Sequence, residues 1–375
     1  MVCDYLRNVL RNTGGDLKMI QLNDIFRESL MMIIGTAALT VFGIIVGLLY
    51  KGVDRKVSAH MQGRIGPPIV QPFRDIRKLL TKENIVPENA IPWIFHLAPV
   101  IGLVATISIL LYLPIGPFAP IAAGYGDLIL ILYLLIIPSL AFVIGGFASG
   151  SPYATVGAQR EMVTMMSYEF PLAIIIMTFA WKISEINSEN LTPFLISDIA
   201  TTPIWGLVGS IGFIGAILLL FTLMVVTPAE LSKIPFDSPE AETEIGGGLL
   251  VEYSGRNLGM FYLMDSVKTF VMGTIIVTLF FPYTISHIAG LGAIPALSLE
   301  AIPIYIIELI FFLVKVLIVV IFSVSLIRVA VARLRIDQIA ETYFWWFTLI
   351  ALFGLILVMW DAPVTTWLNG ILGIG

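Results

Sequence analysis

Five acidic side chains lie close together in a segment that connects two long apolar stretches of this chain. The segment begins Ile234-Pro-Phe-Asp-Ser-Pro-Glu-Ala-Glu-Thr-Glu and continues to Val251-Glu-Tyr-Ser-Gly255, and the acids are Asp237, Glu240, Glu242, Glu244 and Glu252. Apolar residues such as Phe236 and Tyr253 are interspersed with them, so we expect the segment to fold back against the protein. Carboxylates gathered in this way could form a proton route or a docking surface, although a solvated acidic surface is the simpler interpretation.

The composition identifies an integral membrane protein. Of the 375 residues, 58% are hydrophobic and only 13% are charged, against roughly a quarter charged in a globular domain. Eight apolar runs are long enough to cross a bilayer. They are Leu30–Tyr50, Trp93–Ile115, Leu128–Phe147, Met162–Ile183, Ile204–Val226, Leu258–Tyr283, Ile302–Ile327 and Tyr343–Trp360. Each must be helical, because lipid offers no partner to an unpaired backbone group, and this predicts an all-α fold with eight transmembrane helices.

We expect a single eight-helix membrane domain over residues 30–365, between an N-terminal tail (1–29) and a C-terminal tail (366–375). No signal peptide is predicted, because charged residues occur throughout the first tail. Translation could also begin at Met19, which would remove three of the four basic residues of that tail.

The distribution of Lys and Arg predicts the orientation in the cell membrane. The connections after the first, third, fifth and seventh spans hold fourteen of these residues, and those after the second, fourth and sixth spans hold none. The first set, which includes the long loops 51–92 and 228–257, is therefore expected in the cytoplasm, with both termini outside.

A short amphipathic helix is predicted within the first cytoplasmic loop. Phe73, Ile76, Leu79 and Leu80 recur at helical spacing, with basic residues between them. This pattern is typical of a helix in the membrane interface, with its basic side toward lipid headgroups or a partner. Headgroup binding is the more common role of such a basic face.

Five charged residues lie away from the ends of the predicted spans, where each costs about 2.5–3.5 kcal/mol on insertion scales and is a functional candidate by default. They are Glu169, Asp265, Lys268, Glu308 and Lys315. Glu169 is the strongest candidate, because its position leaves it no easy route to the interface. Pro171 lacks an N–H and frees the carbonyl of Ser167 nearby.

Other charges allow more than one interpretation. Glu161, at the expected start of the fourth helix, lies about 80° from Glu169 around the axis, so both could face one cavity. Glu161 could instead extend to the interface, as could Lys182 and Asp361 near other helix ends.

Two pairs of charges share a predicted helix. Asp265 and Lys268 are three residues apart and could neutralise each other. Glu308 and Lys315 are separated by about 10 Å along the helix axis, so each needs another partner or water.

The chain lacks residues for redox chemistry of its own. It has one cysteine and three histidines, without a CxxC pair, so it cannot hold an iron–sulfur cluster alone. The histidines do not provide the usual axial pair for haem, and Gly246-Gly247-Gly248 is not followed by the Lys-Ser/Thr of a phosphate loop. We expect no metal, no cofactor and no nucleic-acid binding in this chain, which would interact with the lipid bilayer. If redox chemistry drives this protein, another subunit performs it.

Several segments together resemble one family. They are Gln62-Gly-Arg-Ile-Gly-Pro with Gln71-Pro-Phe-Arg-Asp, Ser167-Tyr-Glu169, Pro235-Phe-Asp-Ser-Pro-Glu-Ala-Glu-Thr-Glu244, Val251-Glu-Tyr-Ser254 and Arg328-Val-Ala-Val-Ala-Arg-Leu-Arg-Ile-Asp-Gln338. The set resembles the membrane subunit that joins the redox arm to the ion-pumping arm in respiratory complex I (the NuoH type) and in energy-converting, membrane-bound NiFe hydrogenases.

The resemblance implies contacts with hydrogenase-like large and small subunits, an iron–sulfur subunit and antiporter-like membrane subunits. It also implies a buried chain of carboxylates. When Glu161 and Lys268 are added to these carboxylates, the expected proton or ion path comprises eight residues. They are Glu161, Glu169, Glu240, Glu242, Glu244, Glu252, Asp265 and Lys268. The expected redox-arm interface comprises Arg64, Arg74, Asp75, Arg77, Asp237, Arg328, Arg333, Arg335 and Asp337.

Two departures from complex I sequences refine this expectation. Asp265 stands where those sequences usually carry Glu, which keeps the carboxylate but shortens it. The stretch Arg64-Ile-Gly-Pro-Pro-Ile-Val-Gln71 lacks residues that belong to the quinone entrance, and in this it resembles the hydrogenase branch.

The resemblance thus implies a ferredoxin-driven, ion-translocating oxidoreductase, with the NiFe centre and the iron–sulfur clusters in partner subunits. A quinone-reducing or sulfur-reducing complex, a stand-alone secondary transporter and a passive anchor remain open alternatives.

Overall fold

The computed structural model describes residues 2–122, 126–186, 194–201, 203–288 and 302–361, and they are almost wholly helical. Within these ranges the only β-pairing is two isolated bridges, from Ile115 to Phe118 and from Asp127 to Leu195. Eight of the described helical stretches are long and apolar enough to cross a membrane. The predicted all-α integral membrane fold is confirmed.

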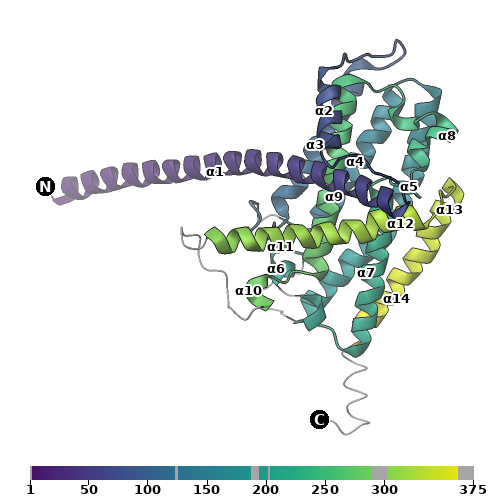
Figure 1. The fold of residues 1–375 in the computed structure, drawn as a ribbon. Coiled ribbons are helices and arrows are strands. Elements are labelled where there is room, and N and C mark those ends of the chain that lie inside the picture. Colours follow the sequence, from purple (N-terminus) through teal and green to yellow (C-terminus); the bar gives the residue numbers. More distant parts are fainter. Residues whose placement is uncertain (1, 123–125, 187–193, 202, 289–301, 362–375) are drawn as a thin grey trace, which may run out of the picture. The chain divides into compact units, whose positions relative to one another are not determined.

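The eight spans run Met32–Met61, Pro92–Tyr112, Leu128–Ala148, Pro152–Glu185, Ser210–Glu230, Gly255–Phe280, Ile302–Ala330 and Ile336–Met359. In Figure 1 the corresponding helices are α1 (Val2–Met61), α3 (Pro92–Tyr112), α4 (Leu128–Ala148), α5 (Pro152–Ile186), α7 (Ser210–Glu230), α9 (Gly255–Phe280), α11 (Ile302–Val320) with α12 (Leu326–Ala330), and α13 (Ile336–Glu341) with α14 (Thr348–Met359). Shorter helices are α2 (Gln71–Thr81), α6 (Ile196–Thr201), α8 (Glu242–Ile245) and α10 (Ile285–Ile288). Residues 1–42 and 43–375 are two separate compact units, and the site described below lies within the second.

The fourth span begins at Pro152, not at Met162, so Glu161 lies well inside a helix. The predicted start at Arg160 and Glu161 was wrong, because Gln159, Arg160 and Glu161 interrupt the apolar run without interrupting the helix. Proline is favourable in the first turn of a helix, where its missing N–H would have no partner anyway.

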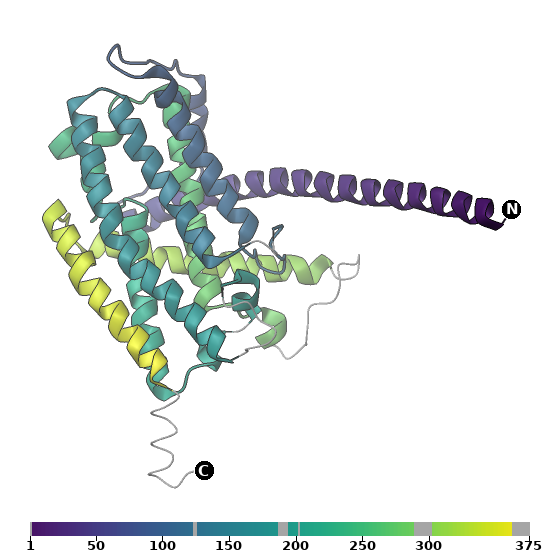
Figure 2. The same ribbon diagram turned by 180° about the vertical axis from the view of Figure 1, so that it is seen from behind.

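Helix α9 is the most buried of the spans, and every residue from Ser266 to Phe280 is buried. It packs against α2, α3, α7 and α11, and both views show it among these helices (Figures 1 and 2). Gly47 of α1 lies directly against the carbonyl of Ser266, where a Cβ atom would collide. This close approach brings the α1 residues that follow Gly47 next to the charged side chains of α9.

Prolines inside two spans free backbone carbonyls, and side chains from other segments satisfy them. Pro99 cannot donate to the carbonyl of Phe95, which accepts a hydrogen bond of 3.2 Å from the Tyr253 hydroxyl. Pro228 likewise frees the carbonyl of Met224, which accepts a hydrogen bond of 2.7 Å from Ser323 Oγ.

The seventh and eighth spans each contain a π-helical segment, at Ile321–Ser325 and at Thr342–Phe347. Ser323 lies in the first of them. In the second, Tyr343 donates a hydrogen bond of 2.8 Å to the carbonyl of Val225. Both segments therefore attach to α7 just before Glu230, and such local widening of a helix is frequent at functional sites.

The acidic segment folds back against the membrane helices, as predicted. It forms short helical turns at Ser238–Glu240, Glu242–Ile245 and Gly248–Leu250. Phe236, Leu249 and Tyr253 are buried, and the Tyr253 ring stacks on Phe95 with centroids 4.1 Å apart.

Contacts join the connections after the first, third, fifth and seventh spans at one end of the helices. Arg160 near the start of α5 donates to the carbonyl of Ser238 at 3.2 Å. Arg333, after α12, forms an ion pair with Asp237, and Ile91 donates its amide to the carbonyl of Ala148 at 2.9 Å. These are the connections in which the sequence places all fourteen basic loop residues.

The amphipathic helix is confirmed as α2, which buries Pro72 and Ile76 and packs on α9. Its place in the membrane interface stays a prediction.

Replacing Tyr253 with Phe tests the tie between the acidic segment and α3. A buried carbonyl without a partner costs about 1–3 kcal/mol, so we expect Tyr253→Phe to lower the free energy of unfolding by about that amount. Unfolding in detergent measures it. In a Pro99→Ala background, where residue 99 regains an N–H, the same change should cost less. Equal losses in both backgrounds would contradict this explanation.

Candidate functional site: a buried charge network

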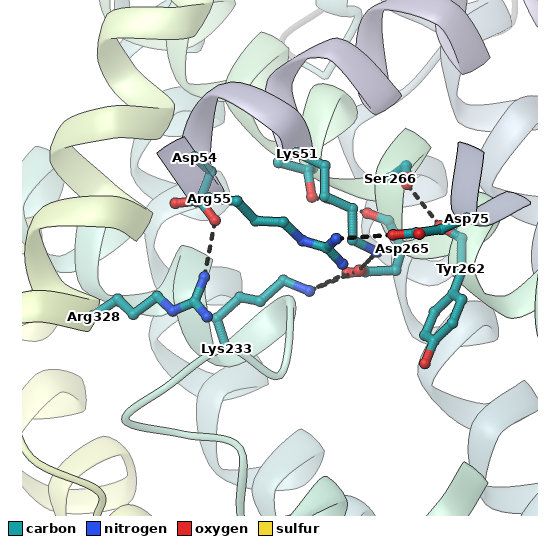
Figure 3. Close-up of polar contacts among 10 residues, drawn as sticks. Lys51, Asp54, Arg55, Asp75, Lys233, Tyr262, Asp265, Ser266 and Arg328 are labelled. Carbon is teal, nitrogen blue, oxygen red and sulfur yellow. Dashed lines mark hydrogen bonds and ion pairs between the residues drawn. The ribbon is translucent and has the colours of Figure 1, made fainter. Parts of the chain in front are cut away.

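Asp265 of α9 is held between two lysines from different parts of the chain. Lys51 Nζ lies 2.6 Å and Lys233 Nζ 2.7 Å from its carboxylate, and the side chains of this triad are 13–22% exposed. Figure 3 shows Lys51 extending from α1 and Lys233 from the residues just before the acidic segment. The expected pair between Asp265 and Lys268 is therefore absent from this site. Each of the two has a better-placed partner on another element.

Lys268 instead forms a fully buried ion pair with Glu230 at the end of α7. Nζ and Oε1 are 2.8 Å apart, and each side chain is 3% exposed. Lys268 also donates to Ser139 Oγ at 2.9 Å, and Ser139 lies 3.2 Å from the Tyr168 hydroxyl, which interacts with Glu230 as well. Four helices thus contribute to one closed polar cluster.

Glu230 was not among the predicted site residues. The fifth apolar run ends at Val226, which predicts that Glu230 lies in a loop. The helix in fact continues through Pro228 to Glu230. An acid one residue beyond Pro228-Ala229 at the end of an apolar run was the available signal.

Glu161 and Glu169 of α5 both face this pair. Each interacts electrostatically with Glu230 and Lys268, and Glu161 also accepts a hydrogen bond of 3.4 Å from Ser232. Within the described part of the chain, Oε1 of each glutamate is buried without a hydrogen-bond partner. Glu161 is only 1% exposed, so its extension to the interface is excluded. The two acids therefore share the Glu230–Lys268 pair as an electrostatic neighbour, whereas the common cavity stays a prediction.

The acids and lysines described so far form what we call the buried charge network. It comprises Glu161, Glu169, Glu230, Asp265, Lys51, Lys233 and Lys268.

Of the four glutamates expected from the acidic segment, Glu240 comes nearest to this network. Its pKa is raised to about 7, chiefly by burial. The positive charges of Lys233 and Lys51 oppose this shift, and the negative charges of Asp265 and Asp237 add to it. Glu242 and Glu244 are exposed and Glu252 is half-buried. Glu244 forms an ion pair of 2.5 Å with Arg160.

A second polar cluster lies beside the network, around Asp54 of α1 (Figure 3). Asp54 accepts a hydrogen bond of 2.6 Å from Ser325 and pairs with Arg328 at 3.2 Å. Arg55, next in the chain, pairs with Asp75 of α2 at 3.1 Å. The π-helical segment in the seventh span therefore contacts both Asp54 and α7.

The expected redox-arm interface residues fall into two groups. Arg64, Arg74, Arg77, Arg335 and Asp337 are exposed. Asp75, Asp237, Arg328 and Arg333 form the internal ion pairs described above. The first group leaves its charges available to a partner, whereas the second holds the connections together.

A cavity of about 410 Å³ opens between α1, the acidic segment and α9. We call it the charged cavity, and its lining includes Lys51, Glu230, Lys233, Glu240, Asp265 and Lys268. Pockets for organic ligands are mostly hydrophobic, with a few polar groups, so this lining suits water and protons better than an apolar molecule. No three His, Cys, Asp or Glu side chains of the described ranges are grouped so as to hold a metal ion.

Charges at the other ends of the helices have structural partners. Glu308 accepts hydrogen bonds from the Ile285 and Ser286 amides at 2.9 and 2.6 Å, and Lys315 donates to the carbonyls of Phe281 and Tyr283 at 2.8 and 2.7 Å. Separate partners for Glu308 and Lys315 were predicted and are confirmed.

The extension of Lys182 and Asp361 to the interface was wrong. Lys182 is buried and pairs with Glu185 at 2.9 Å. The Asp361 carboxylate accepts hydrogen bonds from the amides of Gly209 and Gly212. It therefore caps α7, since the first amides of a helix have no partner within the helix.

Comparison with known proteins identifies the family to which this chain belongs. A family model described as NADH dehydrogenase matches residues 34–359. The H subunit of the NADH-quinone oxidoreductase of Brevibacillus brevis is 31% identical over 349 residues, which cover 89% of this chain and 94% of that protein. Subunit 8 of the NADH-quinone oxidoreductase of Rhodothermus marinus is 33% identical over 237 residues, covering 61% and 67%.

A solved structure is also similar. A chain of the membrane-bound sulfane sulfur reductase, an archaeal respiratory membrane complex, matches with a TM-score of 0.69 and 28% identity, over 87% of this chain and 99% of that chain. Eight spans around a buried charge network define a multi-pass membrane protein of the complex I-like class. The chain belongs to the NADH dehydrogenase family, as a NuoH-type membrane subunit.

Removing Lys268 tests whether the central pair is as closed as its burial indicates. Lys268→Met leaves Glu230 buried without its cation, and breaking a buried pair from one side costs about 3–5 kcal/mol. The double variant Glu230→Gln/Lys268→Met has no uncompensated charge and should recover most of this loss. Unfolding in detergent compares them, and a single variant no less stable than the double one would refute the closed pair.

Glu240 should make stability depend on pH. Its raised pKa means that the folded state holds this proton more tightly than the unfolded state. The resulting contribution to stability is present below pH 4.5 and is lost as pH rises through about 7. We expect Glu240→Gln to flatten the pH dependence of the unfolding free energy in this range, while the exposed Glu88→Gln follows the wild type. Unchanged pH dependence in Glu240→Gln would show that this carboxyl does not titrate near neutrality.

Proposed function

We propose that this chain is the subunit that connects the redox arm to the ion-pumping arm of a ferredoxin-driven, ion-translocating oxidoreductase, and specifically of a membrane-bound hydrogenase. The NiFe centre and the iron–sulfur clusters would lie in hydrogenase-like large and small subunits and an iron–sulfur subunit. Antiporter-like subunits would adjoin it in the membrane. The family membership and the shortened stretch between Arg64 and Gln71 support this assignment.

The buried charge network is the observation on which the proposal depends. It begins at the charged cavity, where Glu240 and the Lys51–Asp265–Lys233 triad face the connecting loops. It continues through the Glu230–Lys268 pair to Glu169 within the fourth span. A passive anchor has no need of such a continuous set of charges, since each is costly to bury.

Electrostatic coupling between neighbours is strong enough to move protons. Two unit charges 4 Å apart interact by about 4 kcal/mol at an effective dielectric constant of 20, which corresponds to roughly three pKa units. A charge change in a redox subunit that contacts the loops would alter the occupancy of Glu240, and the coupled carboxyls would then redistribute protons as a set. Electrons would not enter this chain.

The orientation is part of the proposal. The connections that hold the basic residues contact one another at one end of the helices, and the positive-inside rule predicts that this end lies in the cytoplasm. The exposed Arg64, Arg74, Arg77, Arg335 and Asp337 would there be available to the redox arm.

A sulfur-reducing complex is the second candidate, because the structural match includes nearly the whole of one chain of the sulfane sulfur reductase complex. The curated relatives are named for quinone reduction, but the charged lining of the cavity does not suit a quinone. Purification of the native chain in mild detergent, followed by mass spectrometry of its companions, distinguishes these. A NiFe large subunit with antiporter-like proteins would support the hydrogenase, a different redox subunit would replace it, and a solitary chain would contradict the proposal.

Glu169→Gln should separate ion pumping from electron transfer. The amide keeps the shape of the side chain but cannot carry a proton, so we expect normal assembly and normal electron transfer to soluble acceptors, with at least about tenfold weaker ion pumping. Acidification or sodium uptake by inverted membrane vesicles measures pumping. The exposed Glu88→Gln is the matched control and should pump normally. Full pumping by Glu169→Gln would remove Glu169 from the path.

A further inference from the structure

A second cavity, of about 330 Å³, lies between α2, the last turns of α1 and the first half of α9. Its lining combines an apolar wall with a basic rim. Leu48, Leu79 and Leu258 form an apolar wall, and Lys78 and Lys82 stand at a basic rim. Lys51, Arg55 and Asp75 also contribute to the lining.

Two of the lysines in this groove have no acidic partner in the described part of the chain. Lys51 is paired with Asp265 and Arg55 with Asp75. Lys78 and Lys82 are exposed, and in the described part of the chain neither has an ion pair. The groove therefore presents two unneutralised ammonium groups next to apolar surface, and it would attract an anion that has an apolar portion.

The position of the groove narrows the ligand class. It lies where two membrane spans approach the same end, since α1 ends at Met61 and α9 begins at Gly255. Helix α2, which forms one wall, is amphipathic and packs on α9. A free inorganic anion would make no use of the apolar wall, and an uncharged hydrophobic molecule would make no use of the lysines.

We propose that this groove binds an anionic phospholipid. Its phosphate would lie between Lys78 and Lys82, and an acyl chain would pack along Leu48, Leu79 and Leu258. Basic pockets between membrane helices on the cytoplasmic side are known to hold acidic headgroups in this way. The lipid would join α2 to α1 and α9 beside the Arg55–Asp75 pair, and so support one wall of the charged cavity. The inference does not depend on which acceptor the redox arm reduces.

Native mass spectrometry of the full-length chain, purified with its companions and delipidated, tests this. Phosphatidylglycerol and phosphatidylcholine with identical acyl chains are the probes. We expect phosphatidylglycerol to be retained at least about tenfold better, because each lysine near a surface favours acidic lipid. Lys78→Gln/Lys82→Gln should reduce its retention to that of phosphatidylcholine.

Lys56→Gln/Arg256→Gln is the matched control, because it removes the same charge from exposed residues outside the groove. It should retain phosphatidylglycerol as the wild type does, and circular dichroism verifies that both variants keep their helices. Equal retention of the two lipids, or no effect of the lysine variant, would overturn the proposal. If the two lipids are retained equally while inorganic phosphate or a quinone binds in a way that requires Lys78 and Lys82, the groove is a simple anion site or a quinone site instead.

Discussion

The ion pair between Glu230 and Lys268 is the constraint on which this protein's interior depends. Two charges withdrawn from water cost several kcal/mol each, and their attraction repays this only when hydrogen bonds satisfy the remaining atoms. Here Ser139 and Tyr168 supply those bonds, so α4, α5, α7 and α9 must keep their relative positions for the pair to survive. The same requirement keeps Glu161 and Glu169 close enough to the pair to interact electrostatically with it, so a change in its charge acts on both. Structural support and electrostatic coupling are therefore properties of one cluster.

Breaks in the helices give the cluster its setting. Pro228 lies two residues before Glu230, and the carbonyl it frees is satisfied by Ser323 from the π-helical segment of the seventh span. That same segment reaches Asp54 through Ser325. Irregular backbone inside a membrane is tolerated only where protein or water satisfies it, so these breaks occur against neighbouring helices. They connect the loop end of α1 to the end of α7 through a single turn.

The sequence predicts which helices exist better than which side chains pair between them. The eight spans follow from length and apolarity alone, because lipid permits no other structure, and the buried Phe236 and Tyr253 made the folded acidic segment foreseeable. Partners across helices were not foreseeable, since Lys51 and Lys233 reach Asp265 over 214 and 32 positions of sequence. The three-residue spacing of Asp265 and Lys268 predicts an ion pair that the structure does not form. The fifth apolar run ends before Glu230, so the run alone does not predict that the helix includes this residue. Glu240, Glu242 and Glu244 belong to one sequence motif, which does not predict that Glu240 is less exposed than the other two.

Infrared difference spectroscopy of the purified complex, recorded between its oxidised and ferredoxin-reduced forms, tests the coupling most directly. Protonated carboxyl groups absorb apart from carboxylates, so a redox-driven change in the network is visible as a band of its own. Our account predicts such a band in the wild type, and its loss or displacement in Glu230→Gln, with reduction of the redox centres unaffected. Identical carboxyl spectra in the two proteins, with reduction complete in both, would contradict the claim that redox changes act through this cluster.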